Sequence, residues 1–219
     1  MSKNNHRIYT ERKIFVIGGV NSYACWLQGV IVKDIREANL VVIIGGADWG
    51  SKYYNQPDIG HYVGDFPESD AWEMGWIQLA IKLNKKIIGI CRGAQILPCL
   101  VGGSIFQHVR HSYNHFIETY DGQKLETNSL HHQLACLDNV KPEDYKLLAW
   151  ANPSPFHMNG WDQDVPQERD AEIVFYPTIG GGALGIQGHP EMMCKTKWYE
   201  DTVNWCQNQL NLFMEDKLK

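Results

Sequence analysis

A cysteine at the end of an apolar strand is the residue of this chain best placed to do chemistry. The run Lys86 to Ile90 predicts a buried strand, and Cys91 follows it between Gly89 and Gly93. Gly-x-Cys-x-Gly between a strand and a helix has the form of a nucleophile elbow, with cysteine in place of serine. This tight turn strains the backbone and points the thiol outward, at the start of a helix expected to begin near Arg92. Free N–H groups there favour the thiolate, and the N–H of Arg92 can donate to an oxyanion.

The competing interpretation is a buried, inert thiol, which is the common state of a free cysteine. The elbow context argues against this for Cys91. The other cysteines lie at positions 25, 99, 136, 194 and 206, with no such context and no CxxC pair. We expect them to be mostly buried free thiols.

A cysteine nucleophile needs a base, and the base needs a group that fixes its tautomer. His189 directly follows the strand-like segment LGIQ and a glycine, so it lies at the end of a predicted strand, where open α/β sheets place their sites. Glu191 is two residues further on and can orient the imidazole. The chain order Cys, His, Glu differs from the nucleophile, acid, histidine order of α/β-hydrolases. A lone histidine is more often structural, but the elbow favours the catalytic interpretation.

Short apolar strands alternate with amphipathic segments, which is typical of a parallel sheet covered on both faces. The further predicted strands are Lys13 to Ile17, Asn39 to Ile44, Ile173 to Tyr176 and Leu184 to Gln187. Thr196 to Phe213 predicts a closing helix.

Another helix is predicted from Asp70 to Leu83, with Asp70 as its N-terminal cap and Glu73 at the capping-box position. Its apolar face is predicted to hold Trp72, Trp76, Leu79 and Leu83. At the same helical spacing, Trp198 and Trp205 are also expected in the core.

The composition and charge of the chain limit the classes of protein to which it can belong. The chain has 219 residues, 44% of them hydrophobic, and a net charge of -5. This balance argues against a nucleic-acid or membrane-surface partner. The polar N-terminus lacks a signal-peptide core, so a cytoplasmic location is expected. We expect a single domain over residues 1–219, with a polar N-terminal arm (1–12) and a probable loop insertion (152–170).

Several segments together resemble the class I glutamine amidotransferase family, and most closely its γ-glutamyl hydrolase branch, the peptidase C26 group. The resemblance covers roughly residues 13 to 207. The segments that carry it are Gly89 to Gln95, Gly188 to Glu191, Gly45 to Asp48, Asn128 to Gln133, Asp70 to Glu73 and Gly102 to Gln107.

The resemblance implies a flavodoxin-like three-layer α/β/α sandwich with a mostly parallel central sheet. It implies a Cys91-His189-Glu191 triad that hydrolyses a γ-glutamyl amide through a thioester, with Gly46 and Arg92 as the oxyanion hole. Substrate-binding residues by the same resemblance are Gln95, Ser129 and His131. The chain departs from the family pattern at Pro98, which falls early in the helix after the elbow and can kink it, and in the length of the 152–170 segment.

Three functions stay open. The first is a stand-alone hydrolase acting on glutamine or a γ-glutamyl amine. The second is a glutaminase subunit that delivers ammonia to a separate synthetase, and the third is a catalytically silent binding protein. A homo-oligomer is also possible. His108, His111 and His115 have a spacing that could suit a metal, but no cysteine or carboxylate accompanies them, so no metal or cofactor is expected.

Overall fold

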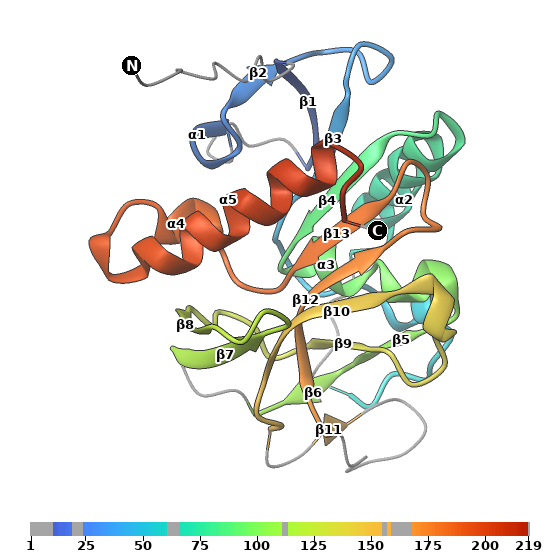
Figure 1. The fold of residues 1–219 in the computed structure, drawn as a ribbon. Helices are drawn as coiled ribbons and strands as arrows, with labels where there is room; N and C mark the ends of the chain where they lie inside the picture. The colour runs from blue at the N-terminus through green and yellow to red at the C-terminus, as the bar shows by residue number, and fades with distance from the viewer. Residues whose placement is uncertain are drawn as a thin grey trace, which may run out of the picture.

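A mixed β-sheet forms the centre of the molecule (Figure 1). The computed structural model describes residues 11–18, 24–60, 66–110, 114–154, 157–158 and 168–218. Within this part of the chain, nine strands form one sheet. In their order across the sheet they are β2 (Gly29–Ile31), β1 (Arg12–Ile17), β3 (Leu40–Ile43), β4 (Lys86–Ile90), β13 (Ala183–Ile186), β12 (Asp170–Tyr176), β10 (Lys146–Ala151), β7 (His115–Thr119) and β8 (Lys124–Thr127).

The strands from β2 to β13 are parallel, and those from β12 to β8 extend the sheet in antiparallel fashion. The predicted strands at 13–17, 39–44, 86–90, 173–176 and 184–187 are confirmed, with shifts of one to three residues at their ends. The edge strand β2 was not predicted. The strands that come between β4 and β12 along the chain were not predicted either. Two small two-stranded sheets pair β5 (Ser104–Phe106) with β9 (Leu134–Cys136), and β6 (His108–Val109) with β11 (His157–Met158).

Helices cover both faces of the parallel strands, which gives three layers (Figure 1). Alternate residues of a strand point to opposite faces. In β3, Leu40 and Val42 face the cluster that holds α5 (Glu200–Met214), and Val41 and Ile43 face the cluster that holds α2 (Pro67–Lys82). The flavodoxin-like α/β/α expectation is therefore confirmed. The other α-helices are α1 (Ala24–Leu27), α3 (Arg92–Gln95) and α4 (Pro190–Met193).

The predicted start of α2 is wrong. The helix begins at Pro67, which suits the first helical position because it lacks an N–H, and no side chain caps it. Asp70 is instead 1% exposed inside the first turn, where an arginine described below occupies its carboxylate.

The predicted apolar face of α2 is also wrong in part. Trp72 and Leu83 are 55% and 37% exposed, while Ile77 and Ala80 are fully buried. The helix thus presents a face rotated from the expected one, because Asp70 also has to face inward, where its carboxylate binds Arg92 and the Gly50 N–H. Trp198 is 77% exposed, against the expectation, whereas Trp205 is in the core as expected.

The predicted closing helix is confirmed as α5, preceded by the short 3-10 helix η5 (Lys197–Tyr199). Residues 1–10 of the predicted N-terminal arm, and most of the predicted insertion at 152–170, lie outside the described residues. Among the described residues, no helix has the length and apolarity needed to span a bilayer.

Candidate active site

Cys91 lies on a sharp turn between β4 and α3. Its backbone has φ 52° and ψ -110°, a conformation that L-residues rarely adopt. The glycines on either side let the turn close. A Cβ on Gly89 would lie 2.2 Å from the carbonyl oxygen of Gly93, and one on Gly93 would lie 2.2 Å from that of Ile43. The strained elbow expected from the Gly-x-Cys-x-Gly pattern is confirmed.

The helix after the elbow is shorter than expected. α3 spans four residues, and a 3-10 helix, η3 (Pro98–Val101), follows it. Pro98 lacks the N–H that would continue the α-helix, so the departure noted in the sequence ends the helix. With one turn of aligned peptide dipoles, the stabilisation of an anion at Cys91 depends mainly on nearby N–H groups.

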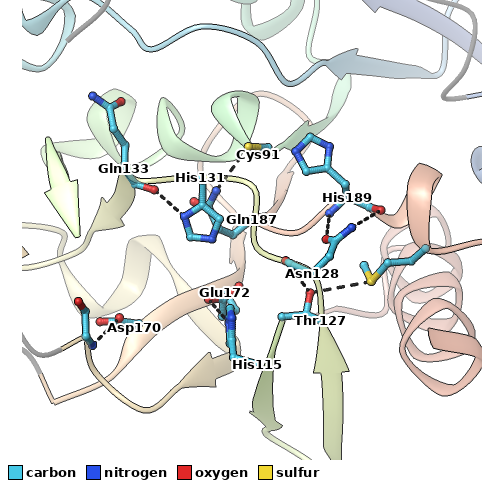
Figure 2. Close-up of polar contacts among 12 residues, drawn as sticks. Cys91, His115, Thr127, Asn128, His131, Gln133, Asp170, Glu172, Gln187 and His189 are labelled. Carbon is cyan, nitrogen blue, oxygen red and sulfur yellow. Dashed lines mark hydrogen bonds and ion pairs between the residues drawn. The ribbon is translucent and has the colours of Figure 1, made fainter. Parts of the chain in front are cut away.

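His189 and Glu191 lie together beside this turn. His189 Nδ1 is 2.6 Å from Glu191 Oε1, and the two residues are 7% and 3% exposed. Figure 2 places the His189 ring next to the Cys91 side chain. Burial lowers the pKa of His189, but hydrogen bonds and charges from Cys91 and Glu191 outweigh burial and raise it to about 10. This arrangement favours the imidazolium form of His189.

Asn128, at the end of β8, holds the backbone of His189 from both sides (Figure 2). Its Oδ1 accepts from the His189 N–H over 2.8 Å, and its Nδ2 donates to the His189 carbonyl over 3.5 Å. Gly188 allows this approach, because a Cβ there would lie 2.5 Å from Thr127 Oγ1. Asn128 belongs to a segment that the sequence singled out, but its own role was not predicted.

The loop after β3 and the residue after Cys91 pack against each other. A Cβ on Gly46 would lie 3.4 Å from Arg92 Cδ, so the two predicted oxyanion-hole residues are neighbours. The buried Arg92 guanidinium binds Asp70 Oδ1 over 2.6 Å and also pairs with Glu73. The Asp70 carboxylate accepts the Gly50 N–H as well, so the loop, α2 and the elbow are tied together.

Trp49 supports the same arginine. Its ring lies 3.7 Å from Arg92 Cζ, and its Nε1–H donates to the Arg92 carbonyl over 3.0 Å. Trp49 is fully buried, which makes it a packing residue.

The predicted substrate-binding residues lie around the 128–133 loop. Gln95 Nε2 donates to the Gln133 carbonyl over 2.9 Å, and His131 Nδ1 lies 2.9 Å from that same oxygen. Gln95 and His131 therefore meet at one backbone group. Ser129 lies on the same loop and is 9% exposed.

A pair of partly exposed histidines lies next to the loop that follows β3. His132 Nε2 is 2.8 Å from Asp48 Oδ2, and its Nδ1 is 3.5 Å from His108 Nδ1. The hydrogen bond that His132 donates to Asp48 raises the pKa of His132. Burial and the nearby His132 lower the pKa of His108. His108 and His115 lie on separate strands, and His111 is outside the described residues. Across the described ranges, no three His, Cys, Asp or Glu side chains converge on a possible metal position.

The remaining described cysteines differ from Cys91. Burial raises the pKa of Cys136 to about 11 and of Cys206 to about 12, so both stay protonated thiols at neutral pH. Burial also raises the pKa of Cys99 far above its ordinary value. Cys194 is exposed, which departs from the expectation of a buried thiol.

One side chain at the site was missed. Gln187 Nε2 donates to Cys91 Sγ over 3.7 Å (Figure 2), and Gln187 is 1% exposed. The sequence did hold a signal for it, because Gln187 ends the strand predicted at 184–187, and strand ends form the sites of open α/β sheets.

The sequence of this chain is similar to those of known proteins. Residues 28–136 match the family model for Peptidase C26. Protein NtpR of Enterococcus hirae is 32% identical over 173 residues, which cover 72% of this chain and 69% of NtpR. The carbamoyl phosphate synthase small chain of Zymomonas mobilis is 24% identical over 172 residues, covering 75% of this chain and 42% of that protein.

The fold is also found among solved structures. A glutamine amidotransferase from Thermotoga maritima superposes with a TM-score of 0.54 at 16% identity, covering 96% of this chain and 91% of that one. This superposition shows a shared α/β fold. The match over residues 28–136 and the relative that is 32% identical show that this chain belongs to the class I glutamine amidotransferase-like family that includes peptidase C26.

Proposed function

We propose that this protein hydrolyses a γ-glutamyl amide bond, in glutamine or a γ-glutamyl amine, through a thioester on Cys91. The observation that carries the proposal is the 2.6 Å contact between His189 Nδ1 and Glu191 Oε1 directly beside the strained Cys91 elbow. A nucleophile, a proton carrier and an orienting carboxylate are the parts that acyl transfer requires.

In this proposal the Cys91 thiolate attacks the γ-carbonyl carbon, and the carbonyl π electrons move onto its oxygen. Backbone N–H groups of Gly46 and Arg92 stabilise that oxyanion. The oxyanion then re-forms the carbonyl, the C–N bond breaks, and the His189 imidazolium gives its proton to the leaving amine. His189, now neutral, takes a proton from water, the hydroxide attacks the thioester, and glutamate leaves as the sulfur regains its electron pair.

The glutamyl head group is proposed to lie against the 128–133 loop, with Gln95, Ser129 and His131 as its contacts. Support comes from the packing of this loop on the elbow helix, through the bond from Gln95 to the Gln133 carbonyl. The partly exposed His132–Asp48 pair joins the 128–133 loop to the loop of Gly46. An entering substrate therefore meets a polar rim before it reaches the thiol.

A second candidate function is the glutaminase subunit of a synthetase that uses ammonia. The similarity to a carbamoyl phosphate synthase small chain favours it. The same chemistry at Cys91 serves both functions, and they differ in whether glutamine turnover depends on a second protein.

Glutamate release tests the proposed function. The purified chain is incubated with glutamine and with a series of γ-glutamyl amines, beside Cys91→Ala and the matched control Cys206→Ala, which changes a buried thiol of α5. Turnover by the wild type and the control, lost in Cys91→Ala, is the expected result. Turnover that survives in Cys91→Ala would refute the proposal. Faster release from a γ-glutamyl amine favours the stand-alone hydrolase, and slow release from glutamine alone favours the subunit.

A further inference from the structure

Gln187 lies level with Cys91 at the ends of two adjacent parallel strands. β13 and β4 pair in parallel register, with Ile186 opposite Ile90, and the Cys91 N–H donates to the Ile186 carbonyl over 2.8 Å. The next residue on each strand therefore arrives at the same edge. From there, the Gln187 side chain reaches the Cys91 sulfur, with 3.7 Å between Nε2 and Sγ (Figure 2).

The position of Gln187 is fixed by its surroundings. Its backbone N–H donates to the carbonyl of Glu172 on β12 over 2.8 Å, which holds the strand end in place. The residue is 1% exposed, and its Oε1 has no hydrogen-bond partner among the described residues. Burying an amide with incomplete pairing is costly, so an apolar side chain of the same length would be cheaper at a purely structural position.

A structural role for buried glutamine is visible elsewhere in the chain. Gln209 on α5 is fully buried and lies in the helix that covers one face of the sheet. Neither polar atom of its side chain has a hydrogen-bond partner among the described residues, whereas Gln187 Nε2 donates to the sulfur of the proposed nucleophile. The two glutamines therefore form a matched pair with different surroundings.

We propose that Gln187 is a further catalytic residue, whose side-chain N–H donates to the Cys91 sulfur and stabilises it as a thiolate. The inference rests on the proposed function, since it assigns a role in that same reaction. A hydrogen bond from a neutral N–H favours an anionic acceptor over a neutral one. It therefore assists twice: it holds the thiolate before attack, and it stabilises the sulfur when the thioester breaks and the sulfur regains its electron pair.

The geometry explains why such a donor is needed. α3 spans four residues, so its dipole offers the sulfur limited stabilisation. Cys91 is 6% exposed, so water contributes little. His189 interacts with both Cys91 and Glu191, and in the proposed reaction its imidazolium serves as the proton donor to the leaving amine. Gln187 adds a donor that carries no transferable proton and stays in place throughout the cycle.

The test compares Gln187→Met, which keeps the length and removes the donor, with Gln187→Glu, which keeps the shape and places an acceptor beside the sulfur. Gln209→Met is the control for loss of a buried amide. Each variant is checked for folding by circular dichroism and thermal melting. The rate of alkylation of Cys91 by iodoacetamide, read by mass spectrometry, reports the thiolate without any need for substrate.

Gln187→Met is expected to alkylate about 10- to 100-fold more slowly at pH 7, as a hydrogen bond to a charged group implies. Gln187→Glu is expected to be slower still, because two negative groups then meet. kcat for glutamate release is expected to fall in both with KM little changed. Gln209→Met is expected to keep the wild-type alkylation and turnover rates, because neither polar atom of the Gln209 side chain has a hydrogen-bond partner among the described residues. A folded Gln187→Met that alkylates at the wild-type rate overturns the inference, and so does a Gln187→Glu variant that matches the wild type.

The experiments distinguish a failure of the proposed reaction from a failure of the role proposed for Gln187. A wild type that releases no glutamate, yet alkylates at Cys91 in a Gln187-dependent way, refutes the proposed reaction and leaves the Gln187–sulfur contact supported. If Gln187→Met does not fold, Gln187→Glu, which keeps the side-chain shape, decides the matter by the same two measurements.

Discussion

His189 and Glu191 are joined by a 2.6 Å hydrogen bond although only Pro190 separates them in the chain. Pro190 opens α4, so the chain turns at His189 and brings the carboxylate of Glu191 back to the imidazole. The base and its orienter thus come from one short segment, whose backbone Asn128 holds in place at His189.

Replacing Glu191 by glutamine is predicted to lower kcat for glutamate release about 10²- to 10⁴-fold, because the imidazole loses the group that fixes its tautomer and stabilises its charge. KM is expected to change little. Steady-state kinetics of Glu191→Gln beside Glu200→Gln, an exposed carboxylate of α5, checks this. Equal rates in the two variants would remove Glu191 from the mechanism.

The raised pKa of His189 predicts a pH-dependent stability. The pKa is 6.5 in the unfolded chain and about 10 in the folded protein, where Cys91 and Glu191 offset the effect of burial. The folded state therefore binds the proton more tightly. The stabilisation is fully present below pH 6.5 and is lost as pH rises through about 10.

Urea unfolding between pH 6 and 10.5 measures this effect, with Glu191→Gln as the comparison. The wild type is expected to lose more free energy of unfolding over this range than the variant, because the variant lacks one of the two groups that hold the proton. Parallel pH curves for the two proteins would contradict the assignment.

The buried Arg92–Asp70 pair is predicted to stabilise the fold and to hold the loop of Gly46 in position. Its side chains are 6% and 1% exposed. Asp70→Asn removes one of the two carboxylates that pair with Arg92, at a cost of about 1.5–3 kcal/mol, as for a hydrogen bond to a charged group. The exposed Arg36–Asp34 pair is the control, and Asp34→Asn is expected to leave stability almost unchanged, because solvent screens an exposed pair. Urea denaturation checks both, and comparable losses would show that Asp70 is not held as described.

Two glycines are predicted to respond in opposite directions to the same substitution. Gly93→Ala places a Cβ 2.2 Å from the Ile43 carbonyl oxygen, so the elbow must shift, and both stability and turnover are expected to fall. Gly75 is exposed in α2 with open space around it, and Gly75→Ala is expected to stabilise the protein by about 0.5–1 kcal/mol. Thermal melting and glutamate release of the two variants provide the measurement. A Gly93→Ala protein as active and stable as the wild type would mean that the elbow is not tightly closed.

The residues of the proposed mechanism could be found from sequence because their signals are local. Cys91 is flanked by its glycines, and Glu191 is two residues from His189. The parallel strands could be predicted for the same reason, because each is a short run of apolar residues. The antiparallel strands β10, β7 and β8 could not, because their pairing depends on partners that lie far away in the chain.

The supporting residues were missed because their roles depend on contacts distant in sequence. Asp70 has the local signature of a helix cap, yet its carboxylate binds Arg92, 22 residues away. Asn128 and Gln187 act on residues 61 and 96 positions away. Such contacts depend on strand order and register, which the pattern of residue types does not determine.

The most direct test of the account is to trap the γ-glutamyl enzyme. The wild type is mixed with a γ-glutamyl anilide, quenched in acid within milliseconds to seconds, digested and mapped by mass spectrometry. The account predicts a γ-glutamyl adduct on the peptide that carries Cys91, sensitive to hydroxylamine as a thioester should be, and absent in Cys91→Ala. Glutamate release without any adduct on Cys91, or an adduct confined to another cysteine, would contradict it.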